Sequence, residues 1–95
     1  MKSRVCLYDR YIKEFRCKYY ITKSTKRFVT GEELINCFGV KIDKLDSKGE
    51  ILSTAEVEDV GINEADVRQF IKLLNDGQVT PITLKDIVSD MVQSY

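Results

Sequence analysis

Two carboxylates near the C-terminus have a spacing that allows side chains to act together. Asp86 and Asp90 are four residues apart, which places them on one face of a helix. Two carboxylates so placed can bind a divalent cation or shift each other's pKa. The same spacing is also ordinary on the solvated face of a helix, and this is the interpretation we prefer. We therefore predict no catalytic residue and no metal site here.

The side chain that enzymes use most often for proton transfer near neutral pH is missing. The chain has 95 residues and no histidine, so serine and cysteine nucleophiles lack their usual base. Its five glycines are scattered and form no phosphate-binding loop. We expect no cofactor, and a non-enzyme in preference to a small histidine-free enzyme that uses carboxylates.

The three cysteines, Cys6, Cys17 and Cys37, are too far apart in sequence for the usual zinc-binding motifs. An odd number of cysteines, without an apolar leader segment, indicates reduced thiols. We therefore expect a cytoplasmic protein. No apolar run is long enough to span a bilayer, so we expect no contact with a membrane.

Charge is distributed unevenly along a chain whose net charge is zero. Residues 1–30 carry nine Lys or Arg and two Asp or Glu, and the rest of the chain carries the opposite excess. Basic side chains alternate with aromatic ones in this first third, and the residues of this candidate basic–aromatic surface are Arg16, Lys18, Tyr20, Lys26 and Arg27. Cations that contact phosphates and rings that stack on bases are typical of single-stranded nucleic-acid binders. Alternatively, the basic residues pair with acidic residues on neighbouring strands, which is the interpretation we prefer.

Four segments show the period of two that is typical of half-buried strands, at residues 4–8, 14–22, 34–42 and 51–60. Residues 9–13 are expected to form a turn, and the polar, basic residues 23–31 a loop. The residues expected to point inward are Val5, Leu7, Phe15, Cys17, Tyr19, Ile21, Leu34, Phe38, Val40, Ile42, Ile51, Ala55 and Val57. Strands joined in this order predict an antiparallel meander.

Two amphipathic helices are expected after the strands. Asn63 is a suitable N-cap for the first helix, and Gly77 is expected as the C′ residue that follows it. Thr80 and Pro81 suit the N-cap and N1 positions of the second helix. Apolar residues recur at helical spacing in both, and they are Val67, Phe70, Ile71, Leu74, Ile82, Leu84, Ile87, Val88 and Met91. Residues 1–95 thus predict one α+β domain, a four-stranded antiparallel β-meander followed by two short amphipathic helices packed on one face.

The helical residues also resemble those of a known group of proteins. Residues 78–88 read Gln-Val-Thr-Pro-Ile-Thr-Leu-Lys-Asp-Ile-Val and resemble the C-terminal segment of a family of small uncharacterised proteins from clostridia and related Firmicutes. Residues 38–42 resemble a strand of that family, and Tyr19-Tyr20 its earlier aromatic strand. The chain departs from the family at Thr83, where histidine is usual, so any role of that histidine is lost here. The resemblance implies a shared fold and a bacterial cytosolic setting, and it carries no activity.

The sequence therefore favours a binding or regulatory module that acts through a protein partner or as a homodimer. Nucleic-acid binding through the basic–aromatic surface is the first alternative, and a histidine-free enzyme is the second.

Overall fold

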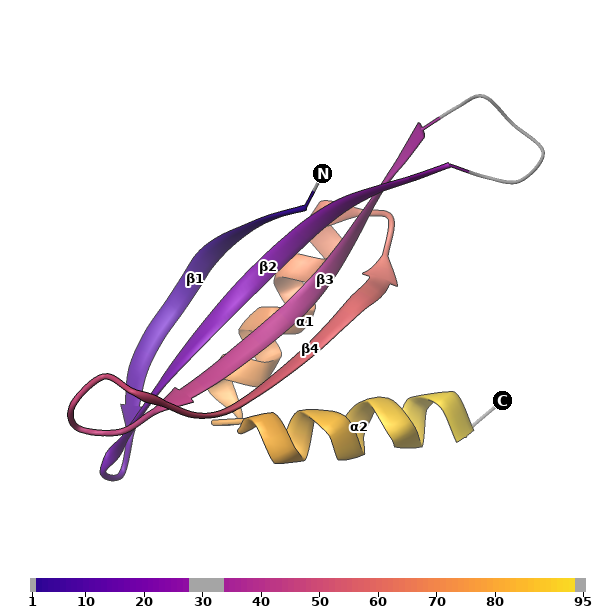
Figure 1. The fold of residues 1–95 in the computed structure, drawn as a ribbon. Coiled ribbons are helices and arrows are strands. Elements are labelled where there is room, and N and C mark those ends of the chain that lie inside the picture. Colours follow the sequence, from indigo (N-terminus) through magenta and orange to yellow (C-terminus); the bar gives the residue numbers. More distant parts are fainter. Residues whose placement is uncertain (1, 28–33, 94–95) are drawn as a thin grey trace.

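The structure, a computed structural model, describes residues 2–27 and 34–93, with side chains for 2–26 and 34–89. Four strands precede two helices: β1 (Ser3–Ile12), β2 (Phe15–Arg27), β3 (Leu34–Leu45), β4 (Ile51–Gly61), α1 (Glu64–Asp76) and α2 (Pro81–Gln93). The strands form one antiparallel sheet in the order β1-β2-β3-β4, and the helices lie on one side of it (Figure 1). The predicted α+β fold is confirmed.

The core lies between the sheet and the helices. The alternation along β2 holds, because Cys17, Tyr19 and Ile21 are buried toward the helices while Arg16, Lys18 and Tyr20 point to the other side. The buried apolar residues of the core cluster are Cys17, Tyr19, Ile21, Phe38, Val40, Ile42, Ala55, Val67, Ile71, Leu74, Val79 and Leu84. We call the opposite side of the sheet the open face.

The first hairpin is longer than the sequence indicated. The predicted turn at residues 9–13 is wrong, because β1 continues to Ile12 and only Lys13 and Glu14 form the turn. Lys13 has a φ of 58°, a conformation that tight hairpin turns require. The predicted loop at residues 23–31 is wrong at its start, since Lys23–Arg27 continues β2 and pairs with β3. The rest of that segment, residues 28–31, lies outside the described residues.

A β-bulge in β1 changes which of its residues face the helices. Val5 pairs with Ile21 and Cys6 with Tyr20, but Tyr8 pairs with Tyr19, so Leu7 is the extra residue. Val5 and Tyr8 therefore share the helix side of the sheet although they are three residues apart. Val5 is nevertheless 55% exposed, so its predicted burial is wrong.

Other apolar residues lie beyond the reach of the helices. Leu34 and Ile51, predicted to be buried, are exposed because they lie at the ends of β3 and β4. Ile82, predicted to pack, is 70% exposed on α2. Among the described residues, no helix is long and apolar enough to cross a membrane.

The helices begin as predicted, and the link between them differs in one detail. Asn63 accepts a hydrogen bond from the Asp66 backbone N–H at 3.1 Å, which caps α1. Gly77 follows α1 with a φ of −84°, so the predicted left-handed C′ conformation is not at this glycine. Gln78 adopts it instead, with a φ of 53°. This turn directs Val79 and Pro81 into buried positions at the start of α2.

Candidate binding surfaces

The basic–aromatic surface lies on the open face, and its cations face acidic partners. Arg16 Nε donates a hydrogen bond of 2.6 Å to Asp9 Oδ1, and a second one joins its Nη2 to Oδ2. This bidentate contact lowers the pKa of Asp9 below its ordinary value. Lys18 pairs in register with Asp9 on β1 and with Asp43 on β3, so it lies between two carboxylate positions. The predicted pairing of basic with acidic residues across strands is thus observed at Arg16.

Tyr20 is flanked by two cations on the open face. The Arg4 guanidinium lies 5.2 Å and the Lys41 ammonium 5.9 Å from the centre of its ring. Burial raises the pKa of the Tyr20 hydroxyl above its ordinary value. Its ring is therefore already in contact with the chain's own cations, which limits its use as a stacking platform.

Three further ion pairs connect Lys2 and Lys26 to β4. Lys26 contacts Asp59, and Lys2 contacts both Glu56 and, at 2.9 Å, Glu58. Lys2 immediately precedes β1, so this bridge joins the two edges of the sheet across the open face. The Arg27 side chain, also part of the predicted surface, lies outside the described side chains.

A polar cluster that the sequence did not indicate lies beneath these charges. Asp43 is only 4% exposed and accepts a hydrogen bond of 2.6 Å from Thr54 Oγ1. Lys41 Nζ lies 3.9 Å from the same carboxylate oxygen. A buried carboxylate with these partners is structurally satisfied. The pairing of Asp43 with Thr54 depends on the register between β3 and β4, which sequence periodicity does not give.

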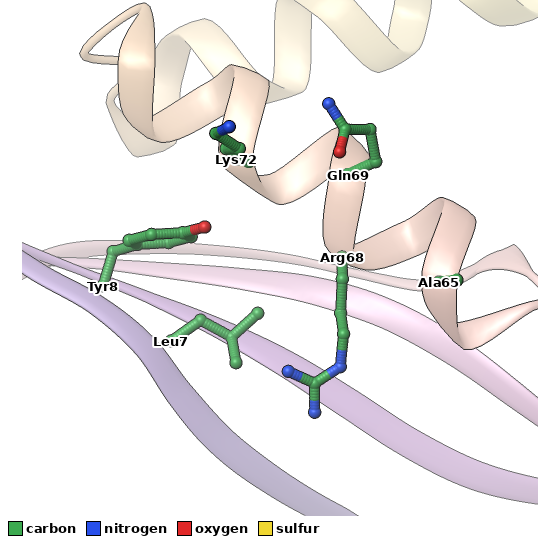
Figure 2. Close-up of a pocket in the computed structure, with 6 residues that line it drawn as sticks. All are labelled: Leu7, Tyr8, Ala65, Arg68, Gln69 and Lys72. Atoms are coloured by element: carbon green, nitrogen blue, oxygen red, sulfur yellow. The ribbon is translucent and has the colours of Figure 1, made fainter.

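The second candidate surface is a groove between β1 and α1. Helix α1 packs on β2, β3 and β4, and α2 packs on β3 and β4, so the helix side of β1 is left largely uncovered. The groove has a volume of about 450 Å³, and Figure 2 shows the six residues that line it. These residues of the β1 groove are Leu7, Tyr8, Ala65, Arg68, Gln69 and Lys72. Apolar surface comes mainly from β1 and charged surface from α1.

The charge of the β1 groove is positive. Arg68 and Lys72 are four residues apart on α1 and both line the groove, and Arg68 extends from α1 to beside Leu7 in Figure 2. Glu64 accepts a hydrogen bond of 3.0 Å from Arg68 Nε and offsets part of that charge. Further along β1, Arg10 Nη1 donates a hydrogen bond of 2.8 Å to the Asn75 carbonyl oxygen at the end of α1. A cation at that position also interacts favourably with the helix dipole.

Sequence reasoning did not identify the β1 groove. Its only signals were the exposed Arg68 and Lys72 on the polar side of α1 and the apolar residues Leu7 and Tyr8 of the first strand. These residues form one groove only because α1 lies over β2, β3 and β4 and stops short of β1, and the sequence does not show that placement.

The pair Asp86 and Asp90 gains no support as a site. Asp86 is exposed on α2, and the Asp90 side chain lies outside the described side chains. In the part of the chain that the structure describes, no group of three or more His, Cys, Asp or Glu residues is arranged to hold a metal ion.

Comparisons with known proteins give a family and no activity. The profile of a family of unknown function, DUF6514, matches residues 2–94. No curated protein and no solved structure matches the chain.

Proposed function

Since the chain belongs to DUF6514, a family of unknown function, we propose that it is a small protein-binding module that acts through β1 and the β1 groove. The two candidate surfaces favour association over catalysis, because neither gathers a nucleophile with a base.

The observation that supports the proposal is an apolar edge strand without a cover. In the described sheet β1 pairs only with β2, so its other edge presents backbone hydrogen-bonding groups. Val5 is more than half exposed beside Leu7 and Tyr8 on the helix side of this strand. Exposed edges of this kind are used by proteins that bind extended partner segments.

The nucleic-acid alternative is supported less by the geometry. Arg16 and Lys26 each contact a carboxylate, and Tyr20 lies between Arg4 and Lys41. A phosphate backbone would have to displace the chain's own acidic residues from these cations. The histidine-free enzyme is supported least, since Glu58 is engaged by Lys2 and Asp86 is an exposed helix residue.

We also propose a bacterial cytoplasmic setting, which the family resemblance and the odd number of cysteines suggest. All three cysteines are free, and the Cys17 thiol is buried in the core, where burial raises its pKa. A buried thiol of raised pKa is unreactive, which agrees with a structural role.

Site-specific photo-crosslinking in cells tests the proposed function. A photoreactive residue replaces Val5 on β1 or, as a matched control, Ile82 on α2, since both side chains are apolar and exposed. We expect a covalent adduct with another protein from position 5 and not from position 82. An adduct of twice the 11.0 kDa chain mass would identify the partner as a second copy. Equal adducts from both positions, or adducts from position 82 alone, would contradict the proposal.

A further inference from the structure

We infer that the free edge of β1 takes an extended acidic segment of another protein as a fifth strand, whose side chains on the helix side reach toward the β1 groove. This inference rests on the proposed function and specifies the chemistry of the partner. It follows from the free edge of β1, from the cations that α1 places in the β1 groove, and from the charge of β1 itself.

The backbone of β1 offers the first contacts. Strand addition places main-chain hydrogen bonds along an exposed edge, and these supply affinity that does not depend on side chains. β1 is an edge strand of ten residues, and its stretch from Tyr8 to Ile12 pairs with β2 without a break in register. An added strand would therefore lie beyond β1, with its side chains on the helix side next to the uncovered part of the sheet.

Side chains of the added strand would point to the helix side at every second position, because alternate residues of a strand share a face. Those nearest Leu7 and Tyr8 would contact apolar surface, so apolar residues fit there. Those nearest Arg68 and Lys72 would contact cations, so carboxylates fit there. Arg68 already contacts Glu64. Lys72 would therefore attract a carboxylate of the partner more strongly than Arg68 does.

A second copy of the chain fits this edge less well. Lys2, Arg4 and Arg10 outnumber Asp9 on and just before β1. Antiparallel pairing of two such strands would bring like charges across from one another, which is unfavourable. An acidic segment from a different protein avoids this repulsion.

Peptide selection on the purified full-length chain tests the chemistry. The probe is a display library of extended peptides randomised among Asp, Glu, Lys, Arg, Ser, Val and Ile. We expect enrichment of Asp and Glu together with Val and Ile. Selection of neutral or basic peptides, or of none, would overturn the inference.

A matched pair of charge reversals tests the location. Lys72→Glu acts in the β1 groove, and Lys85→Glu makes the same change at an exposed position of α2. We expect Lys72→Glu to weaken the selected peptide about tenfold at low salt and Lys85→Glu to leave its affinity unchanged. Equal effects of the two variants would mean that only the net charge of the chain matters, which would also overturn the inference.

Hydrogen exchange and N-methylation test the strand. Binding is expected to slow amide exchange in β1 and not in α2. N-methyl groups on alternate peptide amides are expected to abolish binding in one of the two registers, because only one set of amides faces β1. Binding that survives both methylation patterns would exclude strand addition.

The two proposals can fail separately. A crosslink from position 5 without any acidic preference in the library would retain the protein-binding function and reject its chemistry. Acidic peptides that bind the β1 groove without any crosslink in cells would retain the chemistry and reject the cellular function.

Discussion

Tyr19 connects the sheet to the segment between the two helices. Its side chain is fully buried, and its hydroxyl donates a hydrogen bond of 2.8 Å to the Val79 carbonyl oxygen. Burial raises the pKa of this hydroxyl to about 12. The neutral Tyr19 hydroxyl therefore ties the segment just before α2 to the middle of β2.

Removing that hydroxyl is expected to lower stability and to change its pH dependence. Tyr19→Phe leaves the buried Val79 carbonyl without its partner, which we expect to lower the free energy of unfolding by about 1–2 kcal/mol. In the native chain, the unfolded tyrosine ionises near pH 10 while the folded one keeps its proton until about pH 12. Stability from this group is therefore complete below pH 10 and falls as the pH rises toward 12.

Urea unfolding of both proteins between pH 8 and pH 12 measures this effect. Tyr19→Phe should show the shallower loss of stability over the alkaline interval. Tyr11→Phe is the control, since Tyr11 is exposed, and it should behave as the native chain does. If Tyr19→Phe loses stability with rising pH as steeply as the native chain does, groups other than Tyr19 cause the pH dependence of stability.

The face of the sheet on which each β2 residue lies could be predicted from the sequence. The residues that they contact could not. Alternation places Arg16 and Tyr20 on the open face, as observed. That Arg16 binds Asp9 depends on the bulge in β1, which shifts the register between these two strands by one residue at Leu7. No local pattern in the sequence marks that extra residue.

At the scale of elements, Gly39 of β3 lies directly against the backbone of β4. A Cβ atom at this position would lie 2.2 Å from the Val57 carbonyl oxygen and 2.6 Å from that of Glu58. The register between the strands also shifts here, between Phe38 and Val40. The space beside Gly39 is thus taken by backbone atoms of β4, which side-chain rotation cannot move away.

Gly39→Ala is expected to destabilise the fold by about 3 kcal/mol, because the strands must separate to admit a methyl group. Gly49→Ala is the comparison, since Gly49 has a φ of 85° but no atom within 4 Å of its would-be Cβ. We expect it to cost about 1 kcal/mol, from backbone conformation alone. Thermal and urea unfolding measure both, and equal losses would show that the contact with Val57 is relieved at little cost.

The number and type of elements could be predicted because each has its own period of apolar residues. Their lengths depend on partners far along the chain. Lys23–Arg27 has a polar composition typical of a loop, yet it forms strand because β3 lies beside it and accepts the pairing. The β1 groove could not be predicted for the same reason, because it depends on where α1 stops covering the sheet.

At the scale of the molecule, the charge asymmetry of the sequence is partly removed by folding. Lys2, just before β1, and Lys26 on β2 contact acidic residues of β4, and Arg16 on β2 contacts Asp9 of β1. Among the described residues, the basic excess of the first third of the chain therefore does not form one uncompensated patch.

Nucleic-acid binding by the native chain is consequently expected to be weak. Fluorescence anisotropy with a short single-stranded RNA should show no binding at about 0.15 M salt, where exposed charges are screened beyond about 8 Å. Replacing both Asp9 and Asp59 by Asn releases Arg16 and Lys26, and this variant should bind more tightly at low salt. Tight binding by the native chain, with a steep dependence on salt, would instead favour the nucleic-acid alternative.

The bridge made by Lys2 also affects how copies of the chain meet in concentrated solution. β1 is a basic edge, and β4 carries Glu56, Glu58 and Asp59. The β1 edge of one molecule therefore attracts the β4 edge of another. Head-to-tail pairing of unlike edges does not close, and it would extend the sheet into a fibre. Because Lys2 occupies two of these carboxylates within the same molecule, it weakens that attraction. One lysine side chain thus opposes polymerisation while leaving the β1 edge open to a different partner.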